Sequence, residues 1–198
     1  MNDKKALYFW KFVSVFLMGL ILFSILLSLH YPWEKLLFIN SDFEKGDLTN
    51  WTAEGRAFLN QPTLGDNSLY RGRGAANMRG RYWVGSVEDH HTKDQTWGKL
   101  QGDHLTGTLT SIPFLIERNH IGFMIGGGDS SLNERVVLMV DGKEVATQSG
   151  WGNTIDTETM SRVVWDISPW KGKKAYLIII DSSTGPWGHI NVDDFRYL

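Results

Sequence analysis

The end of the chain gathers residue types that can do chemistry. The segment GPWGHINVDDF, Gly185–Phe195, holds a tryptophan, a histidine, an asparagine and two adjacent aspartates. A histidine beside carboxylates can transfer protons or hold a metal ion, and carboxylates can bind a hard cation. The segment therefore allows three interpretations: a catalytic cluster, a metal site, or the last strand of a β-sandwich.

The alternation of inward and outward side chains breaks within this segment. Ile190 and Val192 fall on one face of an extended strand. The same phase would place Asp194 inward and Phe195 outward. We therefore predict a β-bulge at the two aspartates, which would return Phe195 to the core and turn one carboxylate elsewhere.

A second group of oxygen donors lies in FINSDFEKG, near the start of the predicted domain. On an extended backbone, its amide and carboxylates point to one side, while Ile39 and Phe43 point to the other. Such groups are ligands for Ca²⁺, and an ion here would tie the first strand to the last. A polar rim solvated by water is the alternative. The candidate ligands are Asn40, Asp42, Glu44, Asp193 and Asp194.

Other motifs give weaker signals for chemistry. The glycines of IGGGDSS, residues 125–131, resemble a phosphate-binding loop, but a strand pattern follows where such a loop needs a helix. His90 and His91 are consecutive, which sends their imidazoles in different directions and favours a solvated loop over a metal site. The sequence contains no evident pair of carboxylates facing each other across a cleft, so a glycosidase is a minority alternative.

Short apolar runs separated by turn residues make up most of the chain. Their residues are β-branched or aromatic, as in strands. The runs are RYWVGSV, LTGTLTS, HIGFMI, RVVLMV, SRVVWDI, KAYLIII and HINV. In VVLMVDGKEVAT, Asp141 and Gly142 predict a tight hairpin turn. We predict an all-β fold: one antiparallel two-sheet jelly-roll β-sandwich over residues 38–198.

The N-terminal region has a different composition. Residues 12–29, FVSVFLMGLILFSILLSL, carry no charge and would form a helix of about 27 Å, close to the ~30 Å core of a bilayer. Lysines precede this segment, so the positive-inside rule predicts a cytoplasmic N-terminus. We expect a cytoplasmic tip and one transmembrane α-helix, a signal anchor, in residues 1–29, and a juxtamembrane linker in residues 30–37. A cleaved signal peptide and a buried core helix are the alternatives.

The charge balance and the absence of cysteine exclude some classes of function. The net charge is −2, with basic and acidic residues intermixed, so the basic patch of a nucleic-acid-binding protein is missing. A chain without cysteine has neither disulfides nor thiolate metal sites.

Several strings, taken in order, resemble one family. NSDFEKGDLTNWTAEGRAF, GTLTSIPFLI, IGFMIGGG, VVLMVDGKEV, VVWDIS, GKKAYLIIID and GPWGHINVDDF are similar to the jelly-roll carbohydrate-binding module at the C-terminus of levanases and related fructan-cleaving glycosidases. The resemblance implies glycan binding, to fructan in particular, without bond cleavage, because catalysis in that family belongs to a separate domain. The opening and closing strings also resemble calcium-containing modules that bind xylans or β-glucans, which supports the calcium ligands above.

A sugar site pairs an aromatic surface with groups that make directional hydrogen bonds. Trp83 and Trp165 lie inside strand runs and are expected in the core, whereas Trp187 and Trp151 stand beside glycines in turns. The candidate ligand-binding residues are Trp187, His189, Trp151, Asp129, Asn133 and Arg135, with Arg79 and Arg81 as weaker candidates.

The sequence therefore predicts a single-pass membrane protein that contacts the lipid bilayer through residues 12–29. Outside the membrane it would display a lectin-like, non-catalytic module for a polysaccharide or surface glycan, with a structural Ca²⁺. A structural or protein-interaction β-sandwich without sugar binding is the alternative from another class, and a membrane-bound glycosidase is the third.

Overall fold

The protein divides into two units of unequal size. The structure, a computed structural model, describes residues 13, 16–19, 34–151 and 158–198. The first unit is Met1–Glu34 and the second, compact unit is Lys35–Leu198. Among the residues so described, no helix has the length and apolar character needed to cross a bilayer. Most of the predicted anchor lies outside the described residues, and the anchor stays a prediction.

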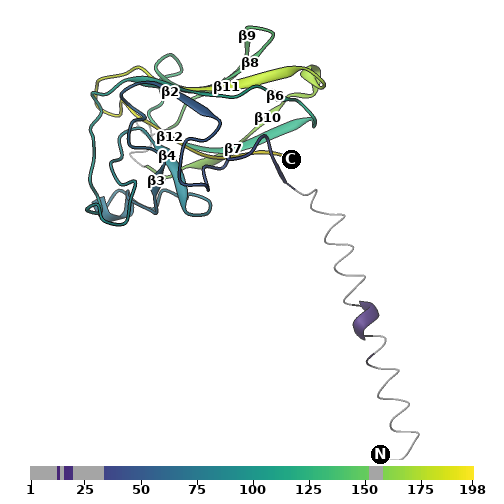
Figure 1. Ribbon diagram of the computed structural model, residues 1–198, viewed down its shortest axis with the longest axis horizontal. Helices are drawn as coiled ribbons and strands as arrows, with labels where there is room; N and C mark the ends of the chain where they lie inside the picture. The colour runs from purple at the N-terminus through teal and green to yellow at the C-terminus, as the bar shows by residue number, and fades with distance from the viewer. Residues whose placement is uncertain (1–12, 14–15, 20–33, 152–157) are drawn as a thin grey trace, which may run out of the picture. The chain divides into compact units, whose positions relative to one another are not determined.

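The compact unit consists of two antiparallel sheets that face each other (Figure 1). In the described residues the first sheet contains β1 (Lys35–Leu36), β3 (Thr63–Leu64), β4 (Tyr82–Gly85), β7 (His120–Gly127), β10 (Ser161–Asp166) and β12 (Ile190–Tyr197). The second contains β2 (Trp51–Gly55), β5 (Gly107–Ser111), β6 (Phe114–Leu115), β8 (Glu134–Val140), β9 (Lys143–Gln148) and β11 (Lys174–Asp181). Short 3-10 helices occur at η1 (Leu69–Arg71) and η2 (Ser168–Trp170).

The predicted all-β, two-sheet sandwich is confirmed. Each apolar run of the sequence contains a strand, and Asp141 and Gly142, with φ of 50° and 76°, make the predicted turn between β8 and β9. The jelly-roll winding of the strands stays a prediction. The strand β1 lies in the segment that the sequence assigned to a linker, because it pairs with the end of β12.

The first sheet is buried on both faces at its centre. Strands β7 and β12 are neighbours there, and nearly every residue of both is buried. One face of the sheet meets the main core, and the other carries a small cluster made of Ala76, Trp83, Met124 and Met160. Loops therefore cover the outer face of this sheet, so the polar residues of β12 must find partners inside the protein.

The register of β12 breaks at the two aspartates, as predicted. The pairing with β7 shifts between Asp193 and Arg196, and Asp194 has a φ of 58°. The Phe195 ring is fully buried and stacks on Phe123 with the ring centroids 5.0 Å apart. The bulge thus turns an aromatic ring into the core.

The predicted alternation over residues 39–44 is wrong. This segment forms turns in which Asn40 and Phe43 have φ of 70° and 57°. The Ile39 side chain is 69% exposed, whereas Phe43 is fully buried against Trp51. Asn40 causes the difference, because its amide nitrogen donates to the Asp47 and Thr49 carbonyls and its amide oxygen accepts from the Lys45 N–H, which curls the chain.

The first and last segments are nevertheless joined. The hydroxyl of Ser41 donates to the carbonyl of Phe195 at 2.8 Å, and the N–H of Phe195 donates to the carbonyl of Ser41 at 3.1 Å. These bonds fix the bulged residues of β12 against the start of the domain.

Removal of the Phe195 ring, which the bulge turns into the core, should strongly reduce the stability of the fold. We expect Phe195→Ala to lower the free energy of unfolding by about 3–5 kcal/mol, because the cavity lies in a packed aromatic cluster. The measurement is urea unfolding, with Val164→Ala as the control. Val164 is 52% exposed, so its truncation should cost less than about 1 kcal/mol. Equal effects of the two substitutions would contradict the assignment of Phe195 to the core.

Candidate functional site

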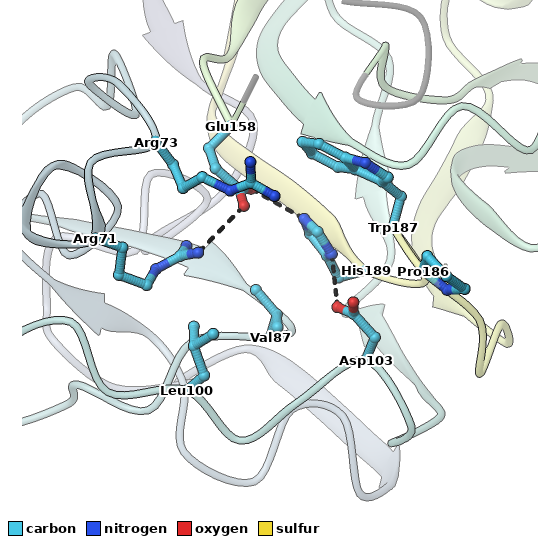
Figure 2. Close-up of a pocket in the computed structure, with 9 residues that line it drawn as sticks. All are labelled: Arg71, Arg73, Val87, Leu100, Asp103, Glu158, Pro186, Trp187 and His189. Atoms are coloured by element: carbon cyan, nitrogen blue, oxygen red, sulfur yellow. Dashed lines mark hydrogen bonds and ion pairs between the residues drawn. The ribbon is translucent and has the colours of Figure 1, made fainter. Parts of the chain in front are cut away.

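A pocket of about 230 Å³ opens where the chain enters β12 (Figure 2). Its wall combines an indole, aliphatic side chains and charged groups that come from distant parts of the sequence. The lining residues are Arg71, Arg73, Val87, Leu100, Asp103, Glu158, Pro186, Trp187 and His189.

His189 is held between two carboxylates. Its Nδ1 lies 2.8 Å from Asp103 and its Nε2 lies 2.9 Å from Glu158 (Figure 2). Burial alone would lower the pKa of His189, but the hydrogen bonds to these two carboxylates and their charges outweigh burial and raise the pKa to about 9. The imidazole is therefore a cation at neutral pH, and both of its N–H groups donate.

Arg71 joins one further carboxylate, that of Glu88, to this group. Its guanidinium lies 3.3 Å from Glu158 and also pairs with Glu88. Burial alone would raise the pKa of Glu158, but the hydrogen bond and charge of His189, with help from Asn191 and Arg71, lower it to about 2. For Glu88, burial is the larger effect and raises the pKa against the charge of Arg71. The result is a buried row of alternating charges that fixes the side chains of the pocket.

A strained turn presents the indole of this pocket. Trp187 has a φ of 60°, and its ring stacks on His189 at 5.5 Å between centroids. Gly188 follows, and a Cβ there would lie 2.7 Å from the Gly185 carbonyl, so a glycine is needed for the turn to close. The guanidinium of Arg73 lies 5.3 Å from the Trp187 ring centroid, a cation–π contact.

Two further carboxylates are buried close to His189. Glu134 and Asp181 are opposite each other in the pairing of β8 with β11. Burial raises the pKa of Glu134, and it raises that of Asp181 to about 7. One oxygen of each carboxylate has no hydrogen-bond partner among the described residues. These groups accept protons more readily than Glu158 does.

The pocket contains two of the six residues predicted to bind a ligand, Trp187 and His189. Trp151 is partly buried and packs against the main core instead. Arg135 lies on β8, where its guanidinium pairs with both oxygens of Glu144 at 2.7 and 2.8 Å. The alternation of β8 buries Val136 and turns Arg135 to the other face of the sheet.

Asp129 and Asn133 belong to the loop before β8 and do not line the pocket. The carbonyl of Asp129 accepts from Ser149, and that of Asn133 accepts from Ser182. Of the weaker candidates, Arg79 lies 3.6 Å from Asp194, and Arg81 lies outside this pocket.

The five predicted calcium ligands divide into two groups. Three are already engaged: the Asn40 amide stabilises its turn, Asp42 pairs with Arg196 at 3.3 Å, and Asp194 pairs with Arg162 at 3.2 Å and also with Arg196. Guanidinium groups thus take the place predicted for a cation at Asp42 and Asp194.

Glu44 and Asp193 form the second group and keep oxygens that a cation could use. Oε1 of Glu44 accepts from the N–H groups of Arg81 and Tyr82, and Oδ2 of Asp193 accepts from the N–H of Arg79. Oδ1 of Asp193 is buried without a hydrogen-bond partner among the described residues. Burial and the charges of Asp194 and Glu44 raise the pKa of Asp193 well above its usual value. The described residues hold no cluster of three or more acidic, histidine or cysteine side chains arranged for a metal.

Sequence reasoning missed the partners of His189. Arg71 ends η1, and Asp103 and Glu158 lie in loops, at separations of 31 to 118 residues from His189 along the chain. No short spacing relates them to the histidine. The only signal is indirect: a histidine entering a strand with no exposed face needs buried partners.

The row of charges predicts a pH dependence of stability. The pKa of His189 is raised from 6.5 to about 9 on folding, so its contribution is complete below pH 6.5 and is lost as pH rises through 9. Urea unfolding of the wild type should show this loss, and His189→Gln should not. An imidazole that titrates near pH 6.5 by NMR would contradict the assignment.

Comparison with known proteins gives limited relationships. No family model matches the chain. The chain is 40% identical over 98 residues to "Putative glycosyl hydrolase ecdE" of Aspergillus rugulosus; the match covers 50% of this chain and 13% of that protein. Among solved structures, TmCBM61 in complex with β-1,4-galactotriose has a TM-score of 0.47 at 17% identity, covering 82% of this chain and 97% of that one. A cyclase of Fischerella sp. TAU has a TM-score of 0.48 at 15% identity, covering 83% and 95%. The two structural likenesses carry no argument about function, and the chain spans only a small part of the curated relative.

Proposed function

We propose that the chain is a non-catalytic, lectin-like module that binds a glycan in the pocket around His189. The observation that carries the proposal is the row of paired charges beside Trp187. A sugar offers hydroxyl groups that donate and accept, together with apolar C–H faces. The pocket offers N–H donors on the Arg71 guanidinium, acceptor oxygens on Asp103 and Glu158, and an indole.

Fixed charges favour binding over catalysis in this pocket. Hydrolysis of a glycosidic bond needs a carboxylic acid that is protonated near neutral pH. Of the groups that line the pocket, Glu158 has a pKa of about 2 and His189 one of about 9, so neither changes its protonation state near pH 7. The carboxyl groups of Glu88, Glu134 and Asp181, whose pKa is raised, do not line it. A glycosidase remains the alternative, and the partial match to a protein named as a glycosyl hydrolase suits either role.

The size of the pocket favours a single sugar unit. Its volume of about 230 Å³ is below the roughly 300–1,000 Å³ typical of sites for drug-sized ligands. We therefore propose recognition of one unit of a polysaccharide, with fructan as the first candidate because of the resemblance of the sequence to fructan-binding modules.

We further propose that residues 12–29 anchor the module in a membrane and that the module lies outside it. The uncharged segment and the lysines before it support this proposal. The polysaccharide would then be held at the cell surface.

Substitutions in the pocket test glycan binding. Fructan, xylan and β-glucan oligosaccharides are offered to the full chain in a detergent without a sugar headgroup. We expect one of them to bind, and Arg71→Ala and Trp187→Ala to weaken that binding by about tenfold or more, because each removes a charged hydrogen bond or the aromatic wall. Calorimetry measures the affinity.

Arg135→Ala is the matched control, since it removes an arginine that the pocket does not use. Failure of all three oligosaccharides to bind would contradict the glycan proposal and favour the protein-interaction alternative. Release of reducing sugar during the experiment would instead identify a glycosidase.

We also propose a structural Ca²⁺ held by Glu44 and Asp193. The unpartnered Oδ1 of Asp193 supports it, because a bound cation would supply the missing partner and would offset the repulsion between the two carboxylates. The ion would join the start of the domain to β12.

Removal of calcium tests this proposal. If Ca²⁺ binds only the folded state, a chelator should lower the melting temperature; at 100 times the dissociation constant the ion contributes about 2.7 kcal/mol. Glu44→Gln should abolish the effect of the chelator. A melting temperature that is the same with calcium and with chelator would exclude the site.

A further inference from the structure

A second pocket lies beside β3, on residues that the first pocket does not use. It has a volume of about 390 Å³, within the range of small-molecule sites. Its lining is apolar with two cations: Leu64, Gly65, Met78, Gly80, Arg81, Lys93 and Trp97. It shares no lining residue with the pocket around His189.

An aromatic stack supports one wall of this pocket. His90 is fully buried, Trp97 is 40% exposed and Tyr70 is 62% exposed. The Trp97 ring stacks on His90 at 3.9 Å and on Tyr70 at 4.4 Å between centroids. The stack therefore runs from the interior to the surface, and the indole in its middle is held in place although it is partly exposed to solvent.

The backbone keeps the indole against the pocket. Gly65 has a φ of 68°, and a Cβ there would lie 2.9 Å from the six-membered ring of Trp97. A side chain at position 65 would push the ring away. Nδ1 of His90 lies 2.8 Å from the carbonyl oxygen of Leu64, which accepts the hydrogen bond and ties the stack to β3.

The charges of this pocket are of one sign. Arg81 and Lys93 line it, and no carboxylate does. Both side chains are exposed, and neither forms an ion pair with any residue that the structure describes. The guanidinium of Arg81 lies 5.6 Å from the Tyr82 ring centroid, a cation–π contact. In the first pocket, by contrast, Arg71 and His189 are paired with carboxylates.

We infer that this pocket is a second binding site, which takes a carboxylated sugar unit of an acidic polysaccharide. The fork of Arg81 matches the two oxygens of a carboxylate, and Lys93 adds a second cation. The apolar wall of Leu64, Met78 and Trp97 suits the C–H face of the ring. The choice of a sugar rests on the proposed glycan binding, whereas the place of the site and the sign of its ligand's charge do not.

The two pockets are connected through η1. Tyr70 stacks on Trp97 beside the second pocket, and the adjacent Arg71 lines the first. One short segment thus supports both sites, so a single polymer could occupy both and gain affinity from the second contact.

Trigalacturonate and its methyl-esterified, neutral form are the probes for this site. Calorimetry on the full chain in a detergent without a sugar headgroup should show binding of trigalacturonate that weakens as salt is raised. The neutral form should bind about tenfold more weakly or worse, because it gives Arg81 and Lys93 no charge to pair with.

The double variant Arg81→Gln/Lys93→Gln should lose about tenfold or more in affinity for trigalacturonate. Both side chains are exposed, so the melting temperature should match that of the wild type and show that the fold is intact. Arg135→Ala is the matched control, because Arg135 lines neither pocket, and it should keep the wild-type affinity for trigalacturonate.

Three results would overturn the inference: equal binding of the two probes, an unchanged affinity in the double variant, or a loss in Arg135→Ala as large as in the double variant. Tighter binding of a sulfated trisaccharide than of trigalacturonate would overturn the assignment of a carboxylate. If the proposal for the first pocket is wrong, neutral oligosaccharides will not bind, whereas trigalacturonate will still bind at the second pocket. The two proposals can therefore fail separately.

Discussion

The burial of polar residues on β12 is the constraint on which the rest of the structure depends. His189, at the entry to this strand, and Asn191, Asp193 and Asp194 within it are 0–4% exposed. A buried charge is tolerated only when it is paired, so other parts of the chain must supply partners. Arg162 on β10 and Arg196 on β12 itself pair with Asp194, whereas loops bring Asp103 and Glu158 to His189. The pocket exists because those two loops meet at the start of β12.

The sequence predicts what depends on a regular period. The apolar runs identify the strands, and the phase of Ile190 and Val192 reveals the bulge that buries Phe195. The same period gave a wrong prediction for the segment around Asn40. The Asn40 side-chain amide makes three hydrogen bonds that hold this segment in turns instead of an extended strand.

The same distinction, between what the sequence pattern reveals and what only the fold brings together, applies to the residues of the site. Trp187 and His189 could be proposed because they adjoin a predicted strand in a glycine-rich turn. Arg71, Asp103 and Glu158 could not, because only tertiary folding brings η1 and the two loops to β12. Arg135 shows the converse error: its residue type suits a sugar, but the alternation of β8 turns it away and Glu144 occupies its guanidinium. Residue type without placement is a weak guide to a binding site.

The central claim is that a glycan enters the pocket and contacts His189. Its most direct test is an NMR titration of the full chain with fructan, xylan and β-glucan oligosaccharides, in which the imidazole N–H signals of His189 are followed. Because both N–H groups already donate to carboxylates, a sugar that enters the pocket must change their surroundings. The account predicts a saturable shift of these signals without cleavage of the oligosaccharide. Binding that leaves the His189 signals unchanged would contradict it.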